Sequence, residues 1–196
     1  SFKGYGTPRD LRSFPTRRAP DRLWASVRAS KIWNELDNMG GPGVQGVGSI
    51  PEAAGWGITV VSIKQMYAGH ATQTMALAAQ CMGGAYFGKF VIVVDDDIDP
   101  TDNGQVLWAM ATRARPSASI DILRETWSTY LDPSQNPPEE RPFGSKCLIN
   151  ACMEYKHIKD FSPRTKLSKA AYENGVSRWA EYGMDGPPPR RTGFED

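Results

Sequence analysis

The chain has 196 residues, which is the length of one domain with a small appendage. Lys and Arg number 23 against 22 Asp and Glu, and the resulting net charge of +1 excludes broad electrostatic binding to nucleic acid or to a membrane surface. Hydrophobic residues make up 40% of the chain, which excludes a disordered polypeptide. The three cysteines, Cys81, Cys147 and Cys152, match no zinc spacing, so we expect reduced thiols in a cytoplasmic protein. No apolar run reaches the ~20 residues of a membrane-spanning helix, and no signal peptide is recognisable.

The first half of the chain predicts a helix, two strands and a second helix. Residues 1–19 are basic and irregular and are expected to lead into the domain. Apolar residues then recur at steps of three and four from Pro20 onward, until Gly40-Gly41-Pro42 ends the helix. Strands are expected over 44–50 and 56–63, followed by a long Ala- and Met-rich helix over 71–87.

The second half begins with the run KFVIVV at 89–94, which is typical of a central strand covered on both faces. An acidic loop follows at 95–102, then a helix capped by Asp102, and strands are expected over 120–123 and 147–153. This alternation predicts an α/β core domain over 20–160, with a mixed or mostly parallel sheet flanked by helices. A C-terminal helix within 161–186 and a flexible polar tail at 187–196 complete the predicted organisation.

The acidic loop admits three interpretations. Asp97-Ile-Asp99-Pro-Thr101 has the D-x-D-x-T form of haloacid-dehalogenase-type phosphatases, in which the first carboxylate attacks phosphorus. The same acids could hold a divalent ion, as in nucleotide-sugar transferases. The structural interpretation is that they cap the next helix. The motif lies in the middle of the chain and no second aspartate pair follows it, which favours the structural interpretation.

Lys64, Tyr67 and His70 follow a strand and precede a helix, at steps of three residues. A lysine beside a helix N-terminus can bind an anion, and a histidine can exchange a proton with a substrate oxygen at neutral pH. The alternative is that Lys64 is solvated, Tyr67 packs and His70 bonds locally. The spacing alone leaves both readings open.

Three longer motifs carry a family resemblance. They are K-Q-x-Y-x-G-H-A at 64–71, K-F-V-I-V-V-D-D-D-I-D at 89–99 and V-L-W-A-M-A-T-R-x-R-P at 106–116, and Gly144-Ser-Lys146 resembles a later element. In this order and spacing the chain resembles the C-terminal domain of the UbiD family of decarboxylases. The resemblance implies a carboxy-lyase that removes carbon dioxide from aromatic or unsaturated acids, with prenylated FMN, Mn²⁺ and K⁺ as cofactors.

The resemblance also implies what this chain lacks. The family's Glu-Arg-Glu catalytic network and its metal ligands lie in the preceding domain, and nothing in residues 1–60 matches them. No catalytic residue and no metal ligand is therefore assigned to this chain. We expect the catalytic half to lie in other polypeptide, and the chain alone to be inactive.

Four positions match the family's site residues. Lys64 corresponds to the lysine that approaches the cofactor phosphate, whereas Tyr67, His70 and Met110 correspond to positions lining the substrate pocket. A buried phenolic hydroxyl needs a hydrogen-bond partner, and His70 could supply one. The expected substrate is therefore a hydroxyaryl acid, of the hydroxybenzoate or protocatechuate type, in a reversible non-oxidative decarboxylation.

Assembly is the remaining expectation. In the family this domain is the main oligomerisation platform, and its last helix commonly reaches a partner, which here would use Trp179 and Tyr182. The expected partners are the protein's own N-terminal catalytic domain and further copies of the chain. The alternative function is a catalytically inactive assembly module, or a split subunit that needs a separate cofactor-binding chain.

Overall fold

Two units make up the chain, Ser1–Lys156 and His157–Asp196. The computed structural model describes residues 14–132, 134, 143–162 and 168–188. Within those residues no helix is both long enough and apolar enough to cross a bilayer. The expected leading segment 1–19 and tail 187–196 lie mostly outside the described residues, as does most of the loop before the last strand.

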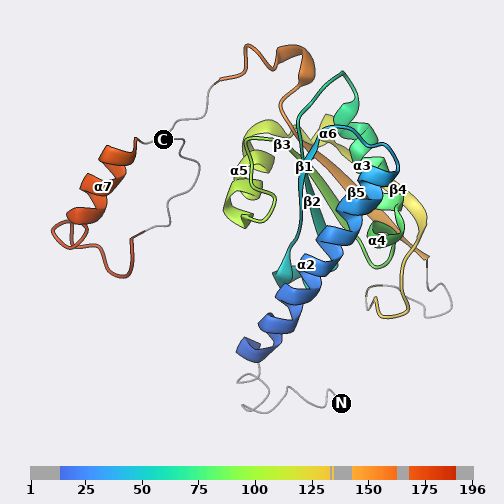
Figure 1. Cartoon of the computed structure of the whole chain (residues 1–196), viewed down its shortest axis with the longest axis horizontal. Helices are drawn as coiled ribbons and strands as arrows, with labels where there is room; N and C mark the ends of the chain where they lie inside the picture. Colours follow the sequence, from blue (N-terminus) through green and yellow to red (C-terminus); the bar gives the residue numbers. More distant parts are fainter. Residues whose placement is uncertain (1–13, 133, 135–142, 163–167, 189–196) are drawn as a thin grey trace. The chain divides into compact units, whose positions relative to one another are not determined.

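A five-stranded mixed sheet forms the centre of the first unit (Figure 1). The strands lie in the order β1-β2-β3-β5-β4, with β2, β3 and β5 parallel and the two edge strands antiparallel to their neighbours. The strand bounds are β1 Val44–Ser49, β2 Ile58–Ile63, β3 Phe90–Asp95, β4 Ile120–Trp127 and β5 Phe143–Ala151. This sheet confirms the predicted fold class.

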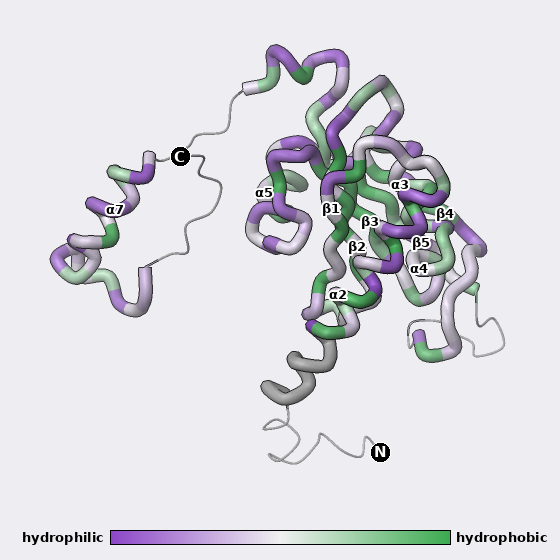
Figure 2. Tube along the Cα trace, viewed as in Figure 1, coloured by the Kyte–Doolittle hydropathy of each residue, from purple (hydrophilic) through white to green (hydrophobic). Residues whose placement is uncertain are grey.

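Alternate residues of the central strands enter two separate cores, because successive side chains of a strand point to opposite faces. Val61, Val93 and Leu148 join a cluster with α2 (Phe14–Asn38) and α3 (His70–Gln80) on one face. Val60, Ile92 and Ile149 join a cluster with α5 (Asn103–Arg113) on the other. Both faces of β2 and β3 are therefore apolar, and Figure 2 shows hydrophobic residues concentrated on these strands.

The helices differ from the sequence prediction in two places. α2 begins at Phe14 rather than at Pro20. The expected helix over 71–87 is two helices, α3 and α4 (Met82–Ala85), because Cys81 between them is extended at φ −60° and ψ 155°. At Gly84 a Cβ atom would lie 1.7 Å from the carbonyl oxygen of Ala78, so only glycine fits this tight turn.

One buried carboxylate ties together the ends of the three parallel strands. Asp95, the last residue of β3, accepts hydrogen bonds from Gln65 Nε2 at 2.6 Å and from the Met153 backbone N–H at 2.7 Å. Its cationic partner is Arg113 of α5, at 2.9 Å, and both side chains are at most 3% exposed. Burial raises the pKa of the Asp95 carboxyl, although these donors and the Arg113 charge act in the opposite direction. This cluster is called the Asp95 clamp below.

Two buried cations hold the segment between α4 and β3. Lys146 of β5 is 1% exposed and donates from Nζ to the carbonyl oxygens of Ala85, at 2.8 Å, and Gly88. Arg28 of α2 donates to the carbonyl oxygens of Tyr86, at 2.8 Å, and Gly84, at 3.2 Å. Burial, with a smaller contribution from the Arg28 charge, lowers the pKa of Lys146 to about 8.

The second unit contains one helix, α7 (Lys169–Ser177), among its described residues. Ser168 caps it by accepting a hydrogen bond from the Ala171 N–H at 3.2 Å. Trp179 donates from Nε1 to the Gly186 carbonyl at 3.0 Å, and Tyr182 is 51% exposed beneath the Arg178 guanidinium. The remaining short helices among the described residues are the 3₁₀ turn Pro51–Ala53, α6 (Pro116–Ser119) and the 3₁₀ turn Tyr155–His157.

Lys146 gives a pH-dependent prediction for stability. Its pKa of about 8 in the folded chain lies below the ordinary value of 10.5, so above pH 8 the unfolded chain binds more protons than the folded chain. The free energy of unfolding should therefore rise with pH, by at most about 3 kcal/mol from this group. Lys146→Met lacks this contribution. Urea denaturation between pH 7 and about 10.5 should therefore show that the free energy of unfolding of the wild type rises with pH relative to that of the variant. A difference that is constant with pH would contradict a buried ammonium.

The Asp95 clamp gives a second prediction. Arg113→Leu leaves the Asp95 carboxylate buried without its cation and should lower the free energy of unfolding by about 3 kcal/mol. Arg115→Leu is the matched control, since Arg115 is 71% exposed and pairs with Glu154 at 3.4 Å, and it should change stability by less than about 1 kcal/mol. If chemical denaturation gave equal losses in the free energy of unfolding for the two variants, the clamp would contribute no stability beyond that of an exposed ion pair.

Candidate functional site

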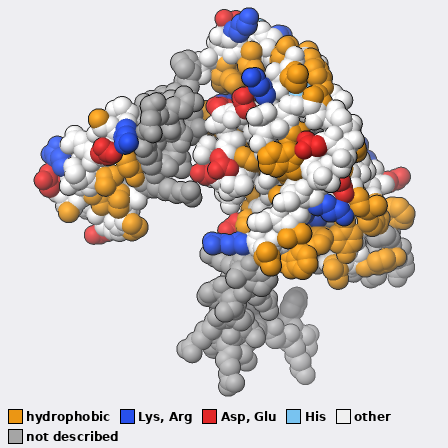
Figure 3. Space-filling model, viewed as in Figure 1, with side chains coloured by type: hydrophobic (Ala, Val, Ile, Leu, Met, Phe, Trp, Pro, Cys, Tyr) orange, Lys and Arg blue, Asp and Glu red, His pale blue; other side chains and the backbone are white. Residues whose placement is uncertain are grey.

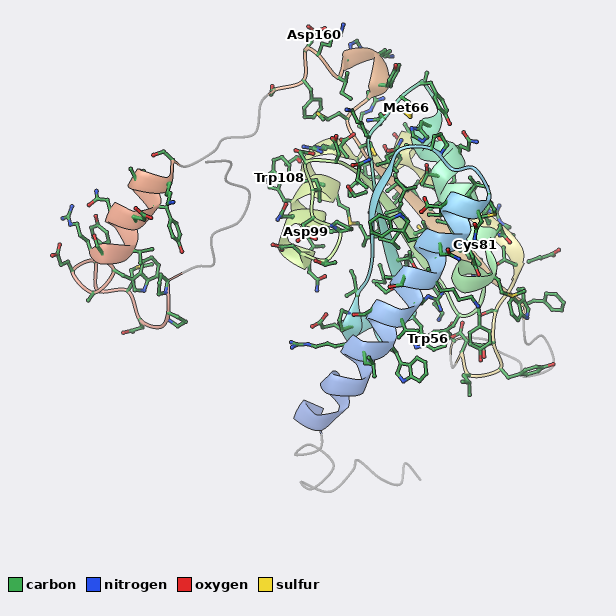
Figure 4. All side chains as sticks on the ribbon, viewed as in Figure 1. Trp56, Met66, Cys81, Asp99, Trp108 and Asp160 are labelled. Atoms are coloured by element: carbon green, nitrogen blue, oxygen red, sulfur yellow. The ribbon has the colours of Figure 1, made fainter. Side chains whose placement is uncertain are left out.

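The candidate site lies at the carboxyl edge of the sheet, where β2, β3 and β5 all end. The segment 64–69 leaves β2 here and leads into α3, and Met66 on this segment is labelled at the upper end of the sheet in Figure 4. Gln65 of the same segment belongs to the Asp95 clamp and also donates to the Met153 carbonyl at 2.8 Å. The clamp therefore fixes the loop that carries Lys64, Tyr67 and His70.

Lys64 is the exposed cation of this edge. Its backbone N–H donates to the Gly43 carbonyl at 2.8 Å, which anchors the residue to the turn before β1. Its ammonium group makes no hydrogen bond or ion pair with any residue that the structure describes. The side chain is thus available to an anion, and its role in binding one stays a prediction.

His70 is buried, with 1% of its surface exposed, and both of its ring nitrogens are used. Nδ1 accepts a hydrogen bond from the Met66 N–H at 3.2 Å, and Nε2 lies 2.8 Å from the Pro42 carbonyl. The first bond requires an unprotonated Nδ1, so the neutral ring carries its proton on Nε2 and donates it to Pro42. This geometry leaves no ring nitrogen for a substrate hydroxyl, and the argument from His70 to a hydroxyaryl acid loses its basis.

Tyr67 lies directly on His70. The two rings are stacked with centroids 4.5 Å apart and planes inclined by 26°. The Tyr67 hydroxyl donates to Gln73 Oε1 at 2.6 Å, and the residue remains 38% exposed. One face of the ring is therefore fixed by the protein while part of the side chain is open to solvent. The structure brings Tyr67 and His70 together, on the loop that begins with Lys64.

Gly43 permits this arrangement. Its φ of +72° is a backbone conformation that residues with a side chain rarely adopt. A Cβ atom there would lie 2.7 Å from the Lys64 carbonyl oxygen and 3.0 Å from His70 Cε1. The turn before β1 therefore packs directly against the loop after β2, and no side chain fits between them.

Met110 is on the other face of the sheet. It is partly buried against the cluster that contains Val106 and Ala109 of α5, whereas α3 contributes to the opposite cluster. Met110 precedes Arg113 by one helical turn, so both lie on the same side of α5. Through Arg113 the clamp connects α5 to the edge that carries Lys64.

The acidic loop has structural roles. Asp102 caps α5 by accepting from the Gly104 N–H at 2.9 Å and the Gln105 N–H at 3.3 Å, as expected. Asp99 accepts from the backbone and hydroxyl of Thr101, and Asp97 receives both terminal nitrogens of Arg113 at 2.8 and 2.6 Å. Among the described residues no group of His, Cys, Asp and Glu side chains is arranged to hold a metal ion.

The sequence analysis did not identify two residues that organise this edge, Gln65 and Arg113. Both lie inside the motifs that carry the family resemblance, and a polar residue directly after a buried strand was a usable signal for Gln65. Cys152, next to this edge, is 4% exposed, and burial raises its pKa well above the ordinary value, which disfavours the thiolate form.

Comparison with known proteins identifies the family. The model of the 3-octaprenyl-4-hydroxybenzoate carboxy-lyase C-terminal domain, the UbiD C-terminal domain, matches residues 21–151. Among solved structures, the chain is similar to vanillic acid decarboxylase of Sedimentibacter hydroxybenzoicus, with 27% identity, 79% of this chain and 31% of that chain covered, and a TM-score of 0.61.

Two further structures share the fold. The UbiD-class enzyme HmfF of Pelotomaculum thermopropionicum, solved with FMN, has 22% identity and a TM-score of 0.64 over 81% of this chain and 33% of that chain. The 3,4-dihydroxybenzoic acid decarboxylase AroY of Klebsiella pneumoniae has 23% identity and a TM-score of 0.64 over 78% and 32%. The chain thus spans about a third of the length of these enzymes. It belongs to the UbiD family of carboxy-lyases, and its first unit has the fold of their C-terminal domain.

Proposed function

We propose that the chain is the substrate-facing C-terminal part of a prenylated-FMN-dependent decarboxylase that acts reversibly on hydroxyaryl carboxylic acids. The observation that carries the proposal is a cation with no partner among the described residues, Lys64, on the same segment as a fixed and partly exposed phenol, Tyr67, at the carboxyl edge of a UbiD-type sheet. The hydroxyaryl class is supported by the substrates named for the vanillic acid and 3,4-dihydroxybenzoic acid decarboxylases.

Lys64 fits the phosphate end of the flavin. Its ammonium is a point charge without a carboxylate partner among the described residues, and Lys64 directly follows β2 at the carboxyl edge of the sheet. Relatives were solved with FMN and with prenylated FMN. When bound, that cofactor supplies the electron sink that decarboxylation of an aromatic acid requires.

Tyr67 and Met110 border the substrate in this proposal. The stacked His70 ring holds Tyr67 in place, and its neutral, twice-bonded imidazole makes it a positioning residue rather than a substrate ligand. Met110 offers a thioether surface from α5, and such a surface adapts readily to an aromatic ring.

Proton transfer and metal binding fall to polypeptide outside this chain. Among the described residues the deeply buried acid of this edge is Asp95, and its oxygens are bonded to Gln65, Arg113 and Met153, so it is not placed to return a proton to the substrate. Mn²⁺ and K⁺ would be held by the N-terminal catalytic domain together with the Glu-Arg-Glu network, and the chain alone would be inactive. The three cysteines are free thiols, which supports a cytoplasmic location.

A second candidate function is a separate subunit or assembly module. The chain spans about a third of the enzymes that it resembles, so its catalytic partner can be another polypeptide as readily as another domain. One relative, HmfF, is known in an evolved dimeric form, which supports assembly through copies of the chain. The mass of the expressed gene product distinguishes the two arrangements.

Lys64→Gln should weaken FMN binding by the complete protein. Loss of a charged hydrogen bond to phosphate costs about 1–3 kcal/mol, so the dissociation constant should rise roughly 10- to 100-fold. FMN fluorescence titration measures this without turnover. Arg124→Gln is the matched control, because it removes one exposed cation on the edge strand β4, and it should leave FMN affinity unchanged. Equal affinities for Lys64→Gln and wild type would exclude the phosphate contact.

Substrate preference tests the hydroxyaryl assignment. The complete, cofactor-loaded protein should turn over 4-hydroxybenzoate or protocatechuate with a kcat/KM at least about 10-fold above that for cinnamate, because the vanillic acid and 3,4-dihydroxybenzoic acid decarboxylases that support this class are named for hydroxylated rings. Release of carbon dioxide, followed with each acid at equal concentration, gives the comparison. Turnover of cinnamate alone would rule out the hydroxyaryl class while leaving the decarboxylase assignment intact.

A further inference from the structure

The segment 64–69, between β2 and α3, forms neither a helix nor a strand. Its backbone polar groups therefore take their partners from other parts of the fold. Both backbone groups of Met66 are bonded to side chains. His70 Nδ1 accepts from its N–H at 3.2 Å, and the Tyr155 hydroxyl donates to its carbonyl oxygen at 2.9 Å. The first partner is four positions further along the chain and the second is 89, so only the second ties Met66 to a distant segment.

Tyr155 belongs to the segment that follows β5. It begins the 3₁₀ turn Tyr155–His157, two residues after Met153. The Met153 carbonyl accepts from Gln65 Nε2 at 2.8 Å, and the Met153 N–H donates to the Asp95 carboxylate at 2.7 Å. Because Gln65 and Met66 are consecutive, the segment after β5 binds the segment after β2 at two successive residues. Tyr155 thus extends the Asp95 clamp from a side chain to the main chain of Met66.

The side chains around this contact are exposed at the carboxyl edge. Met66 is 56%, Tyr67 38% and Tyr155 37% exposed. Figure 3 shows hydrophobic side chains on the surface at the upper end of the first unit, the end at which Figure 4 labels Met66. Partly exposed aromatic and thioether side chains on a backbone that other residues hold in place are typical of a site for a small aromatic ligand.

The Tyr155 bond acts on Tyr67 more directly than on Lys64. The Met66 carbonyl and the Tyr67 N–H belong to one planar peptide, so a hydrogen bond to that oxygen restrains the peptide that leads into Tyr67. Lys64 is held separately, because it follows the paired residue Ile63 of β2 and its N–H donates to a carbonyl of the turn before β1. The cation and the phenol therefore depend on different contacts.

We propose that Tyr155 is a positioning residue for Tyr67. Its hydroxyl fixes the Met66–Tyr67 peptide. Stacking on His70 and the bond to Gln73 fix the Tyr67 ring on α3. Together these contacts set the direction in which the phenol faces an aromatic acid. The inference rests on the proposed function, since that function places Tyr67 at the substrate.

Kinetics of Tyr155→Phe in the complete, cofactor-loaded protein test the inference, because this change removes only the hydroxyl. Loss of one hydrogen bond of ordinary strength should raise the KM for 4-hydroxybenzoate or protocatechuate about 5-fold, whereas the FMN dissociation constant should change by less than about 2-fold. Tyr130→Phe is the matched control, since it removes the hydroxyl of a 66% exposed tyrosine after β4, and both constants should equal those of wild type. Equal rises in KM and in the FMN dissociation constant would indicate a general structural role and overturn the inference.

A double-mutant cycle shows whether Tyr155 acts through Tyr67. In a Tyr67→Ala background, the additional change Tyr155→Phe should leave KM unchanged, because a positioning residue has no effect once the residue that it positions is removed. A further rise in KM of about 5-fold in that background would overturn the inference.

Hydrogen exchange measures the same contact without turnover. Peptides that cover residues 64–70 should exchange about 5-fold faster in Tyr155→Phe than in wild type, and at the wild-type rate in Tyr130→Phe. Circular dichroism of each variant confirms folding. Unchanged exchange in Tyr155→Phe would overturn the inference. If the complete wild-type protein releases no carbon dioxide from aromatic acids, the proposed function is contradicted, and the exchange rates still decide whether Tyr155 holds the peptide before Tyr67.

Discussion

The Asp95 carboxylate holds the segments of the candidate site in place. It accepts hydrogen bonds from the loop after β2, from the chain after β5 and from α5, so one buried anion fixes three segments that are distant in sequence. Burial raises the pKa of this carboxyl, and each of the three donors acts in the opposite direction and favours its charged form. Because Lys64 precedes Gln65 on the first of these segments and Met110 precedes Arg113 by one turn of α5, the clamp connects the two sides of the edge.

The two ends of the sheet differ in chemistry. At the carboxyl edge, polar side chains bond to one another and Lys64 is left over as a cation without a partner among the described residues. At the opposite end, Lys146 and Arg28 bond only to backbone carbonyls, and the surface above them is aromatic. Burial also raises the pKa of Cys81 to about 11, so its thiol near these cations stays neutral. A ligand of opposite charge suits the first end, whereas an apolar surface suits the second.

The sequence predicted the sheet because its central strands are continuous apolar runs, and such runs have few alternatives. It missed the break at Cys81, because an Ala- and Met-rich stretch favours helix throughout, while the break depends on how closely Gly84 approaches Ala78. The structural role of His70 could not be predicted from the sequence for a similar reason. Its Nε2 partner is the carbonyl of Pro42, 28 positions earlier in the chain, and no sequence pattern near His70 predicts that contact. Lys64, whose exposure depends only on leaving a strand, was placed correctly at the edge.

The turn at Gly43 has an evolutionary consequence. Its missing side chain sets the separation between two backbone segments, and one of them carries both Lys64 and the ring that supports Tyr67. Any side chain larger than the hydrogen of Gly43 would displace the segment after β2. A lineage could therefore drift freely in most of its surface loops, yet would be held to glycine here by a contact that involves neither flavin nor acid.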